Sequence, residues 1–125
     1  MSVFRFDASD TVPDWETARA TLLRAFAGSQ EAARDSNPIV YVVHGDDLLG
    51  RRGAPSAMVA TGLLSAARTA AIELRKAGVP VNVIAVGDTT EPETVERWTR
   101  YLTEPDGPTG EIVRLDAGHI GKALP

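Results

Sequence analysis

Residues 53–87, GAPSAMVATGLLSAARTAAIELRKAGVPVNVIAVG, decide the fold, because a long apolar segment leads here through a tight turn into a strand. After Arg52 the next charged residue is Arg68, so residues 55–77 predict a helix that is apolar on every side. Such a helix cannot face water all round, and a chain this short cannot wrap it completely. We therefore expect part of this helix to be buried against another subunit.

Two apolar runs predict strands in the middle of a parallel sheet. Residues 39–43 (IVYVV) and 81–86 (VNVIAV) are almost entirely apolar, which is typical of strands that are covered on both faces. Gly78 precedes the second run and fits the end of the long helix, where a left-handed residue is favoured. Weaker patterns over residues 2–7 and 111–115 predict an edge strand and a final strand.

Two amphipathic helices are expected between these strands. Apolar residues recur at helical spacing over residues 12–34, where Thr11 can cap the helix and Asp14 can return the bond. The same capping logic at Thr90 opens a helix that runs to about residue 102. Each of these helices therefore has one face that can pack on a sheet.

The order of elements predicts a single α/β domain over residues 1–125. A strand and a helix alternate three times and a strand closes the series, which is typical of a parallel sheet with right-handed crossovers. If the strands are laid down in one direction, all connecting helices lie on one face of the sheet. The second face is then left to the third helix, to the C-terminal segment or to a partner.

The composition limits the partners and the location that can be expected. A net charge of -4 does not suit a nucleic-acid-binding face, which needs clustered Lys and Arg, so no nucleic-acid partner is expected. The lack of Cys excludes disulfides and thiolate metal sites. Neither a signal peptide nor an apolar run of about 20 residues is present, so we expect no membrane partner and predict a cytoplasmic protein.

Two motifs in order carry a family resemblance. Residues 78–87 read Gly-x-x-Val-Asn-x-Ile-Ala-x-Gly, and residues 109–118 read Thr-Gly-x-x-(apolar)-x-x-Asp-x-Gly. With residues 38–43 and 67–74, this succession resembles the second half of a short-chain dehydrogenase/reductase (SDR). The resemblance covers residues 12–118 and implies a truncated Rossmann-like (flavodoxin-like) parallel sheet of about four strands with flanking helices.

The pattern also resembles a domain without catalytic function. The chain is similar to the non-catalytic N-terminal domain of the high-molecular-weight 3-oxoacyl-[acyl-carrier-protein] reductases. It also resembles the structural halves of ketoreductase modules in polyketide synthases. By this analogy we expect a structural or regulatory subunit connected with fatty acid or polyketide metabolism.

The residues that the SDR family uses for catalysis have no counterpart here. Its glycine-rich cofactor turn is absent, and its Tyr and Lys fall at Ser56 and Ala60. Its catalytic Ser falls at Val43 or His44, and its nicotinamide-contacting Thr is out of register after Gly87. A Tyr beside a Lys is the proton donor of this family, so the resemblance implies no catalytic residue, no bound cofactor and no metal.

The resemblance also implies an interface. In the SDR family the helices that correspond to residues 12–34 and 55–77 pack against a symmetry mate as a four-helix bundle. We predict an oligomer, most simply a two-fold dimer, or a hetero-oligomer with a full-length reductase or acyl-chain enzyme. The residues expected at this interface are Trp15, Leu22, Phe26, Ala57, Ala60, Gly62, Leu63 and Ala66.

A polar loop over residues 45–54 follows the first central strand. His44, Asp46 and Asp47, with Gly87 after the next strand, are placed where ligands bind in open α/β sheets. As a site they would offer a base and metal carboxylates. The simpler interpretation is a loop that solvates the strand end, so that replacing the His and both Asp residues by Ala changes stability by no more than about 1 kcal/mol.

Three interpretations of function follow. The preferred one is a non-catalytic subunit that associates through its two long helices. The first alternative is a subunit of a composite NAD(P)-dependent 3-oxoacyl reductase, whose cofactor site and catalytic residues come from a partner chain. The second alternative is a small-ligand binding module that uses the strand ends near His44 and Gly87.

Overall fold

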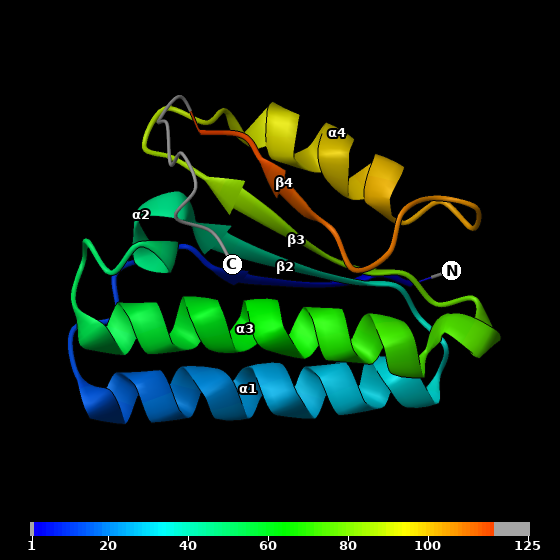
Figure 1. Cartoon of the computed structure of the whole chain (residues 1–125), viewed down its shortest axis with the longest axis horizontal. Helices are drawn as coiled ribbons and strands as arrows, with labels where there is room; N and C mark the ends of the chain where they lie inside the picture. The colour runs from blue at the N-terminus through cyan, green and yellow to red at the C-terminus, as the bar shows by residue number, and fades with distance from the viewer. Residues whose placement is uncertain (1, 117–125) are drawn as a thin grey trace.

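The structure of the protein is a computed structural model, which describes residues 2–116 (Figure 1). Its elements follow the predicted order, with one additional short helix after the second strand. They are β1 (Phe4–Ala8), α1 (Trp15–Arg34), β2 (Ile39–His44), α2 (Gly45–Leu48), α3 (Ala54–Glu73), the 3-10 turn η1 (Arg75–Ala77), β3 (Val81–Val86), α4 (Pro92–Leu102) and β4 (Ile112–Arg114).

The four strands form one parallel sheet in the order β1-β2-β3-β4, which confirms the predicted fold class. Ile39 of β2 lies opposite Phe4 of β1 and opposite Val81 of β3. Every residue of β2 and β3 is buried, as expected for central strands covered on both faces. The edges of the sheet are β1 and the three-residue strand β4.

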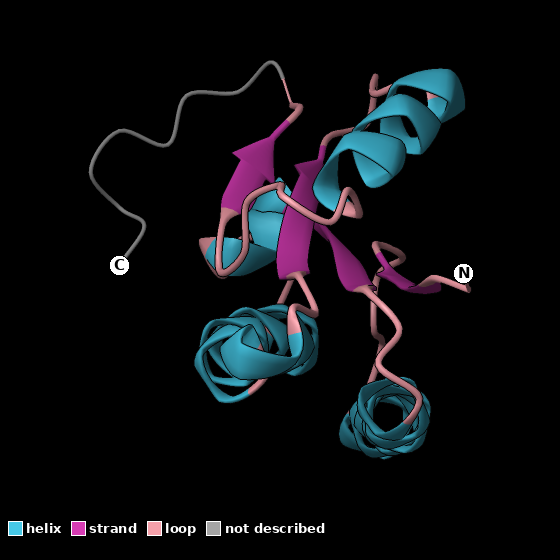
Figure 2. Ribbon diagram, turned by 90° about the vertical axis from the view of Figure 1, so that its right-hand side faces the viewer, coloured by secondary structure: helices cyan, strands magenta, loops and turns pink. Residues whose placement is uncertain are grey.

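Helices cover the sheet on opposite faces. Helices α1 and α3 run side by side along one face, and α4 lies across the other (Figures 1 and 2). The larger core cluster joins α1 and α3 to Ile39, Tyr41 and Val43 of β2. The smaller cluster joins α4 to the alternate residues Val40 and Val42. Because successive side chains of β2 point to opposite faces of the sheet, this strand contributes to two separate cores.

The expectation that all connecting helices lie on one face is wrong for α4. Because the strands follow one another in a single direction, a helix on the opposite face gives the third crossover the opposite hand to the first two. The apolar side of α4 explains this position, because Val95 and Leu102 are buried against Val42 and Ile84. The second face of the sheet is thus covered by the third helix, one of the predicted possibilities.

Helix starts differ from the sequence expectations. Asp14, not Thr11, caps α1, and its carboxylate accepts a hydrogen bond from the Thr17 N–H at 2.7 Å. This hydrogen bonding favours the charged form and lowers the pKa of Asp14. Thr90 does not cap α4; its hydroxyl accepts from the Gly87 N–H at 2.9 Å and lies 3.1 Å from the carbonyl oxygen of Leu115. Both side chains still satisfy backbone groups, at positions other than those predicted.

Asn82 is fully buried in the middle of β3, and its side chain joins three segments. Its Nδ2 donates to the carbonyl oxygens of Pro108 at 2.8 Å and Leu102 at 3.3 Å. Its Oδ1 accepts from the Glu111 N–H at 3.0 Å. This one side chain therefore holds the end of α4 and the start of β4 against the central sheet.

The long helix ends close to where the sequence predicts. Helix α3 stops at Glu73, η1 follows, and Gly78 takes a left-handed φ of 71°. Across residues 2–116, we find no helix with both the length and the apolar character needed to cross a membrane.

Candidate functional site

The strand-end segment folds into a short helix and not into a solvated loop. His44 ends β2 and caps α2, because its Nδ1 accepts from the Asp46 N–H at 3.1 Å. A neutral His44 then carries its proton on Nε2, which lies 2.9 Å from Oδ1 of Asp88. Only 6% of His44 is exposed, so the interpretation that it solvates a strand end is wrong.

Asp47 is also buried and belongs to an ion pair. Its two carboxylate oxygens accept from Nε and an Nη of Arg52, both at 2.8 Å, and only 1% of Asp47 is exposed. The same Nη of Arg52 donates to the carbonyl oxygen of Ser9 at 2.7 Å. These contacts tie the end of β1 to α2 and to the start of α3, and the hydrogen bonds that Arg52 donates to Asp47 raise the pKa of Arg52.

These contacts argue against the small stability change expected for the strand-end residues. Removing Asp47 leaves a guanidinium without its carboxylate, which costs far more than loss of an exposed polar group. Only Asp46 resembles the expected solvated residue, since 39% of its side chain is exposed and it lies 3.5 Å from Arg51. The sequence held one signal for the pair, an Asp followed five residues later by Arg52.

At the C-terminal ends of the strands, where open α/β sheets bind ligands, Asp116 packs against two glycines. A Cβ atom built on Gly45 would lie 2.9 Å from Oδ2 of Asp116, and one on Gly87 would lie 2.7 Å from its Cβ. Arg114 in turn donates to both carboxylate oxygens of Asp116, at 3.0 and 2.7 Å. The segment after β4 therefore lies directly over the ends of β2 and β3, and among residues 2–116 no three His, Cys, Asp or Glu side chains could share a metal ion.

The positions aligned with SDR catalytic residues lie in the core. Ser56 is buried, and its hydroxyl accepts from the Val12 N–H at 2.7 Å, which fixes the entry to α1 against α3. Ala60 and Val43 are completely buried in the larger core cluster. These three residues contribute packing and two hydrogen bonds between the Ser56 hydroxyl and the Val12 backbone.

An apolar groove lies on the outer side of the α1–α3 layer. It has a volume of about 420 Å³, and among its lining residues only Arg19 is charged. Phe26 is 64% exposed and Met58 is 52% exposed, although both are large and apolar. We call this surface the helix face and define it as Trp15, Leu22, Leu23, Phe26 and Met58.

The structure divides the predicted interface residues into three groups. Trp15, Phe26, Gly62 and Ala66 are exposed, while Leu22 and Ala57 are half-buried. Ala60 and Leu63 are buried in the protein's own core and cannot meet a partner, so their assignment to the interface is wrong. Helix α3 is therefore not buried all round; its outer side consists largely of small and hydroxyl residues, namely Thr61, Gly62, Ser65, Ala66 and Thr69.

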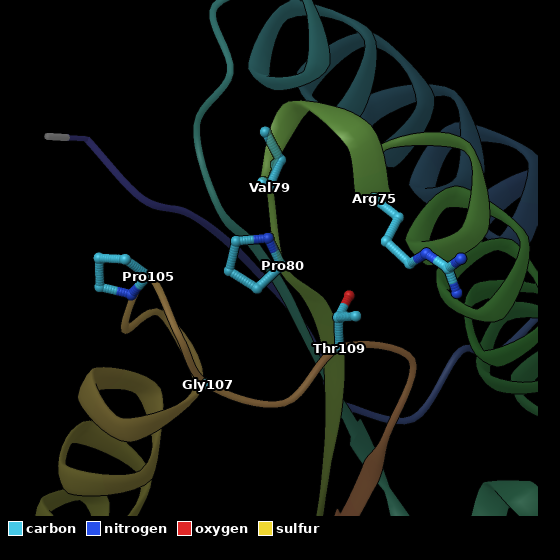
Figure 3. Close-up of a pocket in the computed structure, with 7 residues that line it drawn as sticks. Arg75, Val79, Pro80, Pro105, Gly107 and Thr109 are labelled. Atoms are coloured by element: carbon cyan, nitrogen blue, oxygen red, sulfur yellow. The ribbon is translucent and has the colours of Figure 1, made fainter.

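A smaller pocket of about 180 Å³ lies at the N-terminal ends of the strands, beside the start of β3 (Figure 3). Its walls are mainly Val79, Pro80 and Pro105, and Arg75 provides the one charged side chain of the lining. The Thr109 hydroxyl there accepts from the Val81 N–H at 3.0 Å. The pocket thus offers no pair of groups for acid-base chemistry.

Comparison with known proteins identifies the fold. No family model matches the chain, and no curated protein matches it in sequence. Acetoin dehydrogenase YohF from Salmonella typhimurium matches in structure with a TM-score of 0.77 at 16% identity, over 93% of this chain and 63% of that one. Acetoin dehydrogenase from Enterobacter cloacae matches with a TM-score of 0.74 at 18% identity, over 93% and 62%.

These likenesses confirm the Rossmann-like fold of SDR oxidoreductases that the sequence motifs predict. At this level of identity they establish the fold alone. The chain spans less than two thirds of the length of either dehydrogenase.

Proposed function

We propose that this chain is a non-catalytic structural subunit with an SDR-like fold, and that it associates through the helix face. The exposed groove of Trp15, Leu22, Leu23, Phe26 and Met58 carries this proposal. Contiguous apolar surface on a water-soluble domain marks an association site more often than isolated apolar residues do. The partner is a second copy of the chain, or a full-length reductase or acyl-chain enzyme.

The chemistry of the strand-end region supports a role without catalysis. Val43, Ser56 and Ala60 offer no proton donor where the SDR resemblance implies Ser, Tyr and Lys. Asp116 packs over Gly45 and Gly87 at the C-terminal ends of the strands, where open α/β sheets bind ligands.

Replacing Phe26 by Glu is expected to weaken self-association through the helix face by at least about tenfold, because a charge would enter the apolar groove. Sedimentation equilibrium over a range of protein concentrations measures the change. Ala20→Glu is the matched control, since Ala20 is exposed and lies six residues, or about a third of a turn around α1, from Phe26. A wild-type protein that stays monomeric throughout would contradict association of the chain with itself.

The isolated protein is expected neither to bind nor to oxidise NADH or NADPH, which calorimetric titration and absorbance at the nicotinamide band measure. The reason is the missing glycine-rich turn, which in Rossmann folds holds the pyrophosphate at a helix N-terminus. Micromolar binding to the purified chain would contradict a non-catalytic role.

A composite reductase is the second candidate function, and it is supported by the likeness of the fold to that of acetoin dehydrogenases. In that case, dinucleotide binding would appear only after a partner isolated by affinity capture is added. Binding by the complex, together with no binding by either chain alone, would favour the composite enzyme over the structural subunit.

A further inference from the structure

The outer edge of β1 is a second surface suited to association, separate from the helix face. β1 is the last strand of the sheet on one side, and within residues 2–116 no other strand pairs with its outer edge (Figure 2). A strand edge of this kind presents unpaired N–H and C=O groups to any strand that can align with it.

The ladder with β2 shows which residues point outward. The Phe4 N–H donates to the Pro38 carbonyl at 2.9 Å, so alternate residues from Phe4 onward direct their backbone groups toward β2. The N–H and C=O groups of Arg5 and Asp7 therefore face the open edge. Farther along, the Ser9 N–H donates to the Asp7 carboxylate at 2.9 Å. This N–H is therefore not available to a partner strand, and the open edge ends after Asp7.

The side chains at this edge are complementary to themselves. In an antiparallel pair centred on Phe6, Arg5 lies opposite the partner's Asp7, and Asp7 lies opposite the partner's Arg5. Opposing residues in such a pair have side chains on the same face, so each guanidinium meets a carboxylate. The two residues that would exchange backbone hydrogen bonds are also the two whose N–H and C=O groups face outward.

We propose that two copies of this chain pair antiparallel along β1, with Phe6 on the two-fold axis, and so join their sheets into one. Arg5 and Asp7 form hydrogen-bonded pairs across the axis, and the two Phe6 residues form the closer, non-hydrogen-bonded pair between them. Arg5 and Asp7 lie on the α4 side, where Arg5 already pairs with Glu96, and Phe6 packs on the larger core. This interface uses none of the residues of the helix face.

Two single charge variants and their mixture test the pairing. Arg5→Glu leaves two acidic groups along the edge and Asp7→Lys leaves two basic groups, so each variant alone is expected to self-associate at least about tenfold more weakly, because like charges then oppose each other. An equimolar mixture is expected to restore association, since the two edges complement one another. Asp10→Lys, an exposed change just beyond β1, is the control.

The Phe26→Glu background separates this interface from the helix face, because any association left in it does not depend on Phe26. Sedimentation equilibrium in that background is combined with amide exchange at Arg5 and Asp7, whose N–H groups gain an acceptor only on pairing. We expect a dimer in which both amides become protected as concentration rises. Fast exchange of both amides at all concentrations, or a mixture that associates no better than either variant, would overturn the proposal. If the β1 edge instead binds a strand of another protein, the amides of Arg5 and Asp7 would also exchange fast in the purified chain.

Discussion

The Asp47→Ala variant is expected to lose about 2–4 kcal/mol of unfolding free energy, a large part of the stability of a small domain. Asp47 is almost fully buried, and its loss leaves the Arg52 guanidinium without the carboxylate that accepts both of its hydrogen bonds. The cost stays below that of a fully buried pair because 23% of the Arg52 side chain still reaches solvent. Equilibrium denaturation in urea measures the change.

Two comparisons make this result specific. Asp46→Ala, one residue earlier and partly exposed, is expected to change stability by no more than about 0.5 kcal/mol. Replacing both partners, as Asp47→Leu with Arg52→Met, is expected to cost less than Asp47→Ala alone, because no uncompensated charge remains. Equal losses from Asp46→Ala and Asp47→Ala would show that the ion pair does not stabilise the strand-end segment.

The Asn82→Leu variant is expected to lose about 2–4 kcal/mol, because three backbone groups, one on a buried residue and two in partly buried hydrogen bonds, lose the side chain of a fully buried Asn as their partner. These are the carbonyl oxygens of Leu102 and Pro108 and the N–H of Glu111. Leucine also has a different shape, so it cannot fill the site without shifting its neighbours. Thermal and urea denaturation measure the loss, and amide exchange at Glu111 reports whether β4 detaches.

The only other Asn of the chain provides the control. Asn37 lies outside the central strands and is partly exposed, so Asn37→Leu is expected to change stability by less than about 1 kcal/mol. If Asn82→Leu were as mild as Asn37→Leu, the three hydrogen bonds of Asn82 would not be what joins α4 and β4 to the sheet.

Local patterns were sufficient for the central part of the fold. The unbroken runs of β2 and β3 identified two strands buried on both sides, and Gly78 marked the end of the α3–η1 segment. The face occupied by α4 could not be predicted in this way. It depends on the apolar surface that Val42 and Ile84 form on one face of the sheet. That surface is a property of the assembled sheet and not of the helix itself.

The candidate site shows the same division between local and long-range information. The positions of His44 and Asp47 at a strand end were predictable, but their burial was not, because Asp88 and the Ser9 carbonyl reach this region only after folding. The assignment of Ala60 and Leu63 on α3 to the interface is wrong for a different reason. A helix that is apolar all round has no periodicity to show which side faces the sheet, so Ala60 and Gly62 were indistinguishable in sequence.

The opposite hand of the third crossover determines how many layers the molecule has. If all three connections lay on one side, the protein would be a two-layer domain. Another protein would then have to cover the apolar surface of Val40, Val42, Ile84 and Val86. With α4 on the far side it is a three-layer sandwich whose sheet is already enclosed. A partner can therefore bind to the outer surfaces of the helices and to the edge strands, where large contacts can form without separating the layers.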